Sequence, residues 1–231
     1  MGDRVIVVTG AFGALGQVVA AKLAADGARL ALVDAVPAAS EAVARAFAAH
    51  LLLPAVDLGR FDGAAGAVAT IVQRLGGIDA LVNIAGGFRW QTLEDGDLAV
   101  WDLMYSLNLK TALNACKASL PHLIAGGGGR IVNIGSGAAQ HAGAGMGAYA
   151  ASKSGVLRLT ESLAAETKDH GITVNAILPG TIDTPANRRD MPKADFSRWV
   201  APAALADVVA FLLSDGAAAI TGAGIPVNGR Q

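Results

Sequence analysis

A phenol and an ammonium lie four residues apart within the segment 147–154, at Tyr149 and Lys153. In a helix this spacing brings both side chains to one face. A phenol with its ordinary pKa near ~10 is a poor acid and a poor base at neutral pH, whereas a nearby cation favours the phenolate and lowers that pKa. The pair is therefore a candidate general acid and base. An amphipathic surface helix explains the same spacing, so the interpretation depends on the rest of the chain.

A glycine-rich turn is the second candidate for chemistry. Gly10, Gly13 and Gly16 stand three residues apart, between an apolar run and a stretch with apolar residues at helical spacing. Glycines let the backbone turn tightly and approach a pyrophosphate, which free N–H groups and the positive end of the following helix can bind. An ordinary strand-to-helix turn is the alternative. The position between a strand and a helix favours a nucleotide site.

Asp34 bears on the choice of nucleotide. It closes the second apolar run about 20 residues beyond the turn, where an acid can bind the ribose hydroxyls of an adenosine. A helix-capping role near Pro37 is the alternative. A carboxylate would repel a 2′-phosphate, and no Arg or Lys stands at the neighbouring positions Ala11, Phe12, Ala35 and Val36. The sequence thus predicts NAD(H) in preference to NADP(H), without excluding the latter.

The composition limits the class of protein. With 231 residues, 53% of them hydrophobic, the chain can bury a sizeable core in one α/β domain. Only 16% of residues are charged and the net charge is -1, so neither nucleic acid nor a membrane surface is an expected partner. No apolar run approaches the ~18 residues that span a bilayer. We expect a soluble protein without a cleavable leader.

A single cysteine, Cys116, excludes an intrachain disulfide and a cysteine metal cluster. We expect a cytoplasmic protein with no metal site.

Short β-branched runs alternate with longer Ala- and Leu-rich stretches, which is typical of a parallel sheet covered on both faces. Strands are predicted at 5–8, 30–33, 51–56, 78–82, 130–134, 172–178 and 224–227. Helices are predicted at about 15–27, 37–49, 61–75, 97–124, from Tyr149 to about 168, and 203–213. The predicted fold is a single domain over residues 1–231, with a doubly wound parallel sheet of about seven strands.

The ordered motifs of the chain resemble those of the short-chain dehydrogenase/reductases. The motifs are Thr9-Gly10 with Gly16, Asp57, Asn83-Ile84-Ala85-Gly86, Asn108, Ser136, Tyr149 with Lys153, and Pro179-Gly180 with Thr184. They cover the whole chain, and the serine thirteen residues before the tyrosine is the most specific spacing. The resemblance implies a Rossmann-like fold and hydride transfer between a nicotinamide and a small carbonyl or secondary alcohol.

The resemblance also implies a catalytic set. Tyr149 would exchange a proton with the substrate oxygen, and Lys153 would hold the nicotinamide ribose and lower the pKa of the phenol. Ser136 would hydrogen-bond the substrate oxygen, although a plain turn explains it as well. Asn108 would anchor a water that relays protons to Lys153; without the resemblance it would count as an ordinary polar residue of a helix.

The implied cofactor site draws on the turns that follow several strands. Asp57 would meet the adenine, and Ile182 with Thr184 would meet the nicotinamide amide. The predicted cofactor residues are Gly10, Phe12, Gly13, Leu15, Gly16, Asp34, Asp57, Asn83, Ala85, Gly86, Tyr149, Lys153, Pro179, Gly180, Ile182 and Thr184.

Three positions depart from the family pattern. Ala14 stands where the family's turn has its middle glycine, and Ile84 replaces a second asparagine, which removes a polar contact near the cofactor. The usual glycine pair near the C-terminus is Gly229-Arg230.

Residues 181–200 are the predicted substrate lid, because this turn-rich segment follows the carboxyl end of a strand, where ligands bind in such folds. It resembles the corresponding part of dihydropteridine reductases, so a quinonoid pterin or another quinone-like substrate is the first alternative, although those enzymes lack a serine like Ser136. The predicted substrate residues are Phe88, His141, Met146 and Trp199, with Trp90 a further candidate and packing the alternative for each. Four basic residues of the segment could attract an anionic substrate or simply be solvated: Arg188, Arg189, Lys193 and Arg198.

Other functions are weaker alternatives. His141 follows Ser136 by five residues, but no Gly-x-Ser-x-Gly elbow surrounds the serine, which disfavours a hydrolase. A non-catalytic dinucleotide-binding protein would not be expected to keep the complete Asn-Ser-Tyr-Lys set. By resemblance, the 97–124 helix and the Tyr149 helix are those through which the family forms homotetramers or dimers.

Overall fold

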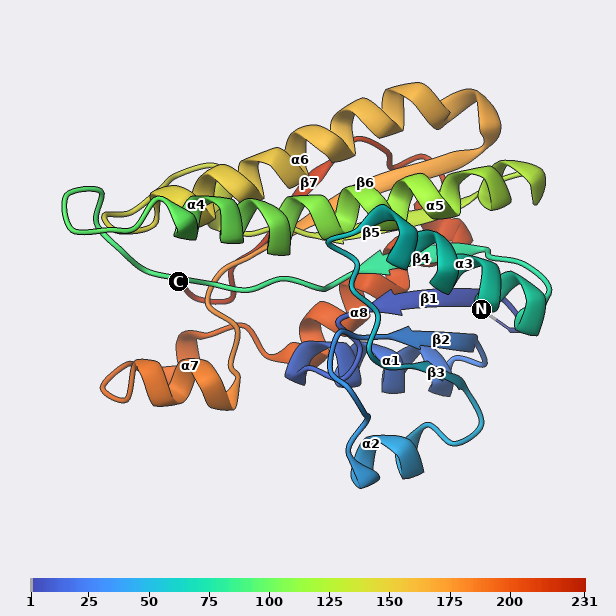
Figure 1. Cartoon of the computed structure of the whole chain (residues 1–231), viewed down its shortest axis with the longest axis horizontal. Coiled ribbons are helices and arrows are strands. Elements are labelled where there is room, and N and C mark those ends of the chain that lie inside the picture. The colour runs from blue at the N-terminus through green and yellow to red at the C-terminus, as the bar shows by residue number, and fades with distance from the viewer. Residues whose placement is uncertain (1) are drawn as a thin grey trace.

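Seven parallel strands form one sheet in the computed structural model, which describes residues 2–231 (Figure 1). In sheet order they are β3 (Leu51–Leu53), β2 (Arg29–Val33), β1 (Val5–Thr9), β4 (Ala80–Asn83), β5 (Gly129–Ile134), β6 (Ile172–Pro179) and β7 (Gly224–Val227). The chain runs outward from β1 to β3 and then returns to place β4 on the other side of β1. This reversal creates a crevice at the carboxyl ends of β1 and β4, where ligands bind in open α/β sheets. The predicted fold is confirmed.

Helices cover both faces of the sheet (Figure 1). One face is covered by α1 (Ala14–Ala25), α2 (Glu41–Ala46) and α8 (Pro202–Leu213), and the other by α3 (Phe61–Leu75), α4 (Ala99–Met104), α5 (Thr111–Ala125) and α6 (Gly147–Thr167). The short helix α7 (Pro185–Asp190) lies beyond the carboxyl edge of the sheet, within the 181–200 segment. Each face of the sheet is therefore buried, as a parallel sheet requires.

The central strand β1 shows how the sequence forms these layers. Val5 and Val7 pack into the cluster that includes residues of α3 and α5, whereas Ile6 and Val8 pack into the cluster of α1 and α8. Successive strand residues point to opposite faces, so an unbroken apolar run is what a strand buried on both sides needs. Full burial of such a side chain contributes roughly 1.5–3 kcal/mol.

Helix α2 is shorter than the predicted helix over 37–49. It begins at Glu41, because the hydroxyl of Ser40 accepts a hydrogen bond from the backbone N–H of Val43 (3.3 Å) and caps the helix there. Residues 37–39 form a bend and a loop instead.

Strand β3 is likewise shorter than the predicted 51–56. Pro54 has no N–H to donate to a ladder, and Ala55 has a positive φ of 57°. The N–H of Ala55 donates to the carbonyl of Val36, and that of Val56 to the carbonyl of Asp34. The chain thus turns from the end of β3 toward the end of β2.

The predicted helix over 97–124 is not a continuous α-helix. Between α4 and α5 the chain forms a π-helix from Tyr105 to Lys110, in which Asn108 is buried. Such π segments interrupt α-helices frequently at functional sites.

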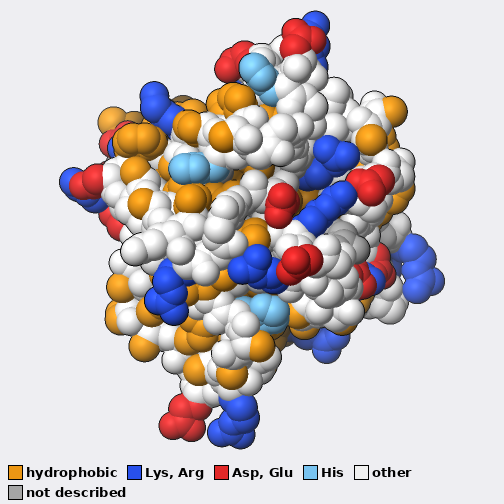
Figure 2. Space-filling model, turned by 90° about the vertical axis from the view of Figure 1, so that its right-hand side faces the viewer, with side chains coloured by type: hydrophobic (Ala, Val, Ile, Leu, Met, Phe, Trp, Pro, Cys, Tyr) orange, Lys and Arg blue, Asp and Glu red, His pale blue; other side chains and the backbone are white. Residues whose placement is uncertain are grey.

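The end of the molecule opposite the crevice carries mixed charges. Figure 2 shows Lys and Arg side chains lying beside Asp and Glu side chains on that face. Within residues 2–231, no helix is long and apolar enough to cross a membrane. The same residues contain no group of three His, Cys, Asp or Glu side chains placed to hold a metal ion.

Candidate active site

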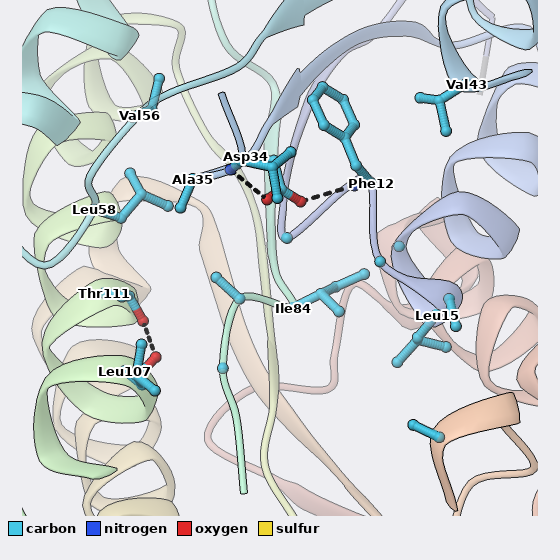
Figure 3. A pocket seen from close by; sticks show the side chains of 18 of the residues that line it. Phe12, Leu15, Asp34, Ala35, Val43, Val56, Leu58, Ile84, Leu107 and Thr111 are labelled. Atoms are coloured by element: carbon cyan, nitrogen blue, oxygen red, sulfur yellow. Dashed lines mark hydrogen bonds between the residues drawn. The ribbon is translucent and has the colours of Figure 1, made fainter. Parts of the chain in front are cut away.

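A cavity of about 910 Å³ opens at the carboxyl ends of β1, β2 and β4 (Figure 3). Pockets for small ligands have volumes of roughly 300–1,000 Å³. The glycine turn after β1, Asp34 after β2, and Ile84 to Gly86 after β4 line it, and Thr184 to Ala186 line it from the 181–200 segment. The cavity is thus built by the segments that the sequence motifs mark.

The glycine turn is shaped by close backbone contacts. Gly10 has a φ of 64°, and a Cβ atom there would lie 2.8 Å from the Cα of Ala85. A Cβ atom at Gly16 would overlap the carbonyl oxygen of Gly10, whereas Gly13 has room for one. Helix α1 begins directly after Gly13, which provides no side-chain cap. The N–H groups of the first turn of α1 are therefore available to an anion.

Asp34 is held at the rim of the cavity by the backbone. Its Oδ2 accepts a hydrogen bond from the N–H of Phe12 (2.9 Å), and its Oδ1 accepts one from the N–H of Val36 (3.2 Å) (Figure 3). The carboxylate does not cap α2, because Ser40 does. Asp57 lines the same cavity, and its Oδ1 accepts a hydrogen bond from the N–H of Gly59 (2.9 Å).

Tyr149 and Lys153 both lie on α6, near the carboxyl end of β5. The Nζ atom of Lys153 donates a hydrogen bond to the carbonyl oxygen of Ile134 (2.8 Å), and the side chain is only 5% exposed. Burial lowers the pKa of Lys153 to about 8. The hydroxyl of Ser136 lies close enough to the phenol of Tyr149 to lower its pKa.

The predicted lowering of the pKa of Tyr149 is not what this structure gives. Burial raises the pKa of Tyr149, and the nearby hydroxyl of Ser136 opposes that rise only in part. The physical reason is desolvation, which penalises the charged phenolate in the same way that it penalises the charged ammonium of Lys153.

The surroundings of the phenol include one of the predicted substrate residues. The ring of Phe88 stands edge-on to the ring of Tyr149, with 4.9 Å between centroids and an angle of 85°. Ser136 is buried just beyond β5, and its hydroxyl accepts a hydrogen bond from the N–H of Ala138 (3.2 Å). The structure thus brings Tyr149, Ser136 and Phe88 together.

Asn108 connects three segments of the site. Its Oδ1 accepts a hydrogen bond from the N–H of Gly87 (2.9 Å), and its Nδ2 donates to the carbonyl of Gly87 (3.1 Å) and to Oγ of Ser152 (3.0 Å). Ser152 in turn donates to the carbonyl of Tyr149 (2.7 Å). A Cβ atom at Gly86 would lie 2.6 Å from Oδ1 of Asn108, so the glycine there leaves room for this contact. The side chain of Asn108 holds the β4 loop against α6.

Sequence reasoning missed Ser152. The available signal was its position three residues after Tyr149, which places a small polar side chain one turn along the same helix.

Within residues 2–231, the other predicted substrate residues make no aromatic contact and no side-chain hydrogen bond with Tyr149. Trp199 packs on Phe196, with 4.7 Å between ring centroids, and Met146 is the residue before the first turn of α6. His141 is exposed, and within residues 2–231 no hydrogen bond joins it to Ser136. The serine–histidine alternative therefore gains no support from the geometry.

Six predicted cofactor residues do not line the cavity: Asn83, Tyr149, Lys153, Pro179, Gly180 and Ile182. Asn83 is buried, and its Nδ2 donates to Oδ1 of Asn133 (2.8 Å) and to the sulfur of Cys116 (3.3 Å). Its amide is thus part of the scaffold beneath the site. Ile182 forms an isolated parallel bridge with Val200, which joins the two ends of the 181–200 segment.

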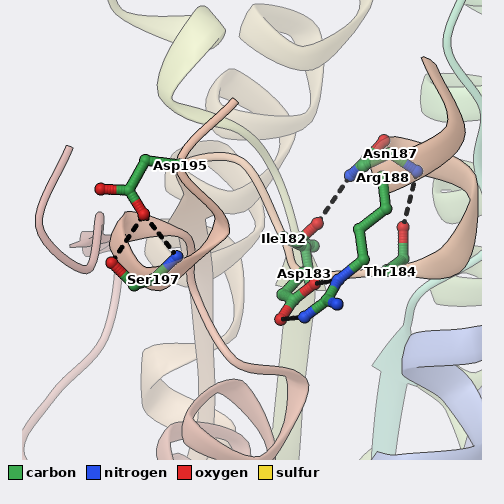
Figure 4. A network of polar contacts seen from close by, with 7 residues as sticks. All are labelled: Ile182, Asp183, Thr184, Asn187, Arg188, Asp195 and Ser197. Carbon is green, nitrogen blue, oxygen red and sulfur yellow. Dashed lines mark hydrogen bonds and ion pairs between the residues drawn. The ribbon is translucent and has the colours of Figure 1, made fainter. Parts of the chain in front are cut away.

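Thr184 has a structural role that the motif did not predict. Its hydroxyl accepts a hydrogen bond from the N–H of Asn187 (3.2 Å) and caps α7, whose first residue is proline (Figure 4). The side chain of Asn187 donates back to the carbonyl of Ile182 (2.8 Å). Arg188 forms two hydrogen bonds with Asp183 (2.6 and 2.7 Å). The segment is therefore an ordered unit with its own contacts.

Comparison with known proteins identifies relatives over the whole chain. The family model described as short chain dehydrogenase matches residues 4–195. The acetoacetyl-CoA reductase of Allochromatium vinosum is 33% identical, and the match covers 98% of this chain and 97% of the relative. The D-threitol dehydrogenase of Mycolicibacterium smegmatis is 35% identical, with 98% and 92% covered. Among solved structures, the carveol dehydrogenase from Mycobacterium avium in complex with NAD has a TM-score of 0.88 at 28% identity, with 99% and 97% covered.

Proposed function

Because the chain belongs to the short-chain dehydrogenase family of oxidoreductases, we propose that it transfers hydride between NAD(H) and a small carbonyl or secondary alcohol. The observation that carries this proposal is the contact of Tyr149 with Ser136, beside the buried Lys153, at the carboxyl end of β5. That arrangement provides one proton donor and one further hydrogen-bonding group for a single substrate oxygen.

The cavity fits a dinucleotide. Gly16 lets the first turn of α1 pack directly against the backbone of Gly10, where a Cβ atom would collide, and the start of α1 presents uncapped N–H groups to the cavity. Asp34 is already oriented by two backbone hydrogen bonds, as a group that binds ribose hydroxyls should be. When bound, the nicotinamide supplies or accepts the hydride.

The proton chemistry belongs to the chain itself. Because burial raises the pKa of Tyr149, the phenol is protonated at neutral pH and ready to donate to a carbonyl oxygen. Ser136 would hold the same oxygen. In the direction of alcohol oxidation Tyr149 must first lose its proton, so we expect that direction to be favoured by higher pH. We assign Lys153 to the nicotinamide ribose, and Asn108 to a proton relay, on the basis of the family resemblance.

The choice of NAD(H) leads to a prediction for Asp34. The variant Asp34→Ala should raise the ratio of NADPH affinity to NADH affinity about 10-fold, because a like charge removed from a 2′-phosphate is worth on the order of 1.4 kcal/mol. Fluorescence titration with both reduced cofactors measures this ratio. The variant Asp34→Asn is the control for the two backbone hydrogen bonds, since it keeps an acceptor and removes the charge. Tighter binding of NADPH than of NADH by the native protein would contradict the NAD(H) proposal.

Turnover tests the reaction class directly. We expect NADH oxidation with at least one ketone or aldehyde of a panel, or NAD⁺ reduction with the matching secondary alcohols. The dihydropteridine-reductase-like alternative stays a prediction, and quinonoid dihydropterin belongs in the same panel. Clear preference for that compound over every ketone would favour the alternative.

We further propose that residues 181–200 form the lid over the substrate, and that copies of the chain associate through α4, α5 and α6. Large apolar side chains are exposed on α4, the π-helix and α5: Trp101, Leu103, Tyr105 and Leu113. Covering such side chains is favourable. Light scattering at micromolar concentration should give a dimer or tetramer mass, and a monomer mass would count against this assembly.

A further inference from the structure

We propose that Arg189 binds the pyrophosphate of the dinucleotide and thereby attaches the 181–200 segment to the cofactor. The inference rests on the proposed function and adds a residue that no motif marks. It concerns how the cofactor is held, and leaves the identity of the substrate open.

The first observation is the charge of the cavity. Its lining includes two carboxylates, Asp34 and Asp57, and among residues 2–231 Arg189 is the single cationic residue that lines it. A dinucleotide brings two further negative charges in its pyrophosphate. The helix α1 supplies only partial positive charge at its first turn. A guanidinium at the cavity therefore balances a charge that the backbone alone leaves largely uncompensated.

The second observation is the difference between two neighbouring arginines on α7. Arg188 is engaged within the segment, because it binds Asp183 through two hydrogen bonds and lies over the ring of Phe196, 4.7 Å from its centroid. Arg189 follows about 100° around the helix, and it lines the cavity. Its side chain makes no ion pair or hydrogen bond with residues 2–231. It is available to a ligand.

The position of α7 favours the pyrophosphate over other anions. Thr184, Pro185 and Ala186 line the same cavity as Gly13 to Gly16, whereas Tyr149 and Ser136 are not part of its lining. Arg189 thus belongs to the cofactor side of the site. Guanidinium groups bind phosphate oxygens through two parallel hydrogen bonds and bring a full positive charge, whereas the start of a helix brings only a partial one.

The anchoring of α7 gives the contact a mechanical effect. Capping by Thr184, the bond from Asn187 to the carbonyl of Ile182, and the pair of Asp183 with Arg188 make the start of the segment one unit. A bond from Arg189 to the cofactor would hold that whole unit over the site, so cofactor binding and closure of the segment would occur together.

The test compares Arg189→Ala with the matched control Lys193→Ala. Lys193 is an exposed cation of the same segment that does not line the cavity. We expect Arg189→Ala to weaken NADH and ADP-ribose binding about 10-fold, the usual effect of one charge-assisted contact, and to reduce the dependence of affinity on salt. Adenosine, which lacks the pyrophosphate, should bind with unchanged affinity. Lys193→Ala should bind all three ligands as the native protein does.

Each other outcome has a defined meaning. The inference would be overturned if Arg189→Ala bound NADH as tightly as the native protein does. It would also be overturned if only NADPH binding were weakened, because the arginine would then bind a 2′-phosphate. An equal loss for adenosine would overturn it too, because it would indicate a general change of the cavity. Native protein that binds no NADH would instead refute the proposed function, so the two failures are distinguishable.

Discussion

Replacement of Tyr149 by phenylalanine is expected to lower turnover at least ~100-fold while NADH binding stays unchanged, which is the usual size of one acid–base contribution. The substitution removes the hydroxyl that contacts Ser136 and keeps the ring that packs edge-on against Phe88. The loss should therefore appear in kcat rather than in the stability of the fold.

Steady-state kinetics with any accepted substrate measures this loss, and NADH fluorescence measures binding. The chain offers a matched control, since its second tyrosine, Tyr105, is exposed on the π-helix. Tyr105→Phe removes a phenolic hydroxyl outside the site and should leave turnover as it is. Undiminished turnover in Tyr149→Phe would remove Tyr149 from the mechanism.

The second large effect concerns Lys153 and protein stability. Because burial lowers the pKa of Lys153 from 10.5 to about 8, the charged form costs the folded protein roughly 3 kcal/mol at neutral pH. Lys153→Met removes that cost. It also leaves the carbonyl of Ile134 without its donor, which offsets part of the gain by about 1–3 kcal/mol. The test is therefore how the difference in free energy of unfolding between the native protein and Lys153→Met changes with pH.

The sign of that change follows from proton binding. Below about pH 8 the lysine is charged in both the folded and the unfolded state, so the native protein carries the full cost. Above it, the folded protein loses the proton while the unfolded chain keeps it, and native stability rises relative to the variant. Both proteins are unfolded with denaturant, without cofactor, at pH 7 and at pH 10. From pH 7 to pH 10, the free energy of unfolding of the native protein should rise by roughly 2–3 kcal/mol relative to that of the variant. A difference that does not change with pH would contradict the burial of a titrating lysine.

The sequence predicted the sheet well because strands buried on both faces give unbroken β-branched runs, such as the one from Val5 to Val8. The predicted boundaries were wrong where a single local interaction ends a helix or a strand. The cap at Ser40 and the positive φ of Ala55 shorten α2 and β3, and neither changes the apolar pattern on which the prediction was based.

The sequence predicted part of the lining of the cavity but not the energetics of the candidate site. Motif spacing predicted Tyr149 and Ser136, which the structure places side by side, and their catalytic roles stay a prediction. The direction of the pKa shift of Tyr149 depends on how much water the fold excludes, which a spacing of four residues does not encode. The sequence could not distinguish Arg189 from the other basic residues of its segment. In the structure, Arg188 binds Asp183, whereas Arg189 lines the cavity.

The π-helix at Tyr105–Lys110 also determines the helical phase of the site. A π turn contains one residue more than an α turn, and one residue corresponds to about 100° of rotation. Deleting a single residue there would restore a regular helix, and either Asn108 would rotate away from Gly87 or Ala112 and Cys116 would rotate out of the core. Because of the extra residue, one continuous helix can direct Asn108 toward Gly87 and still direct Ala112 and Cys116 into the core.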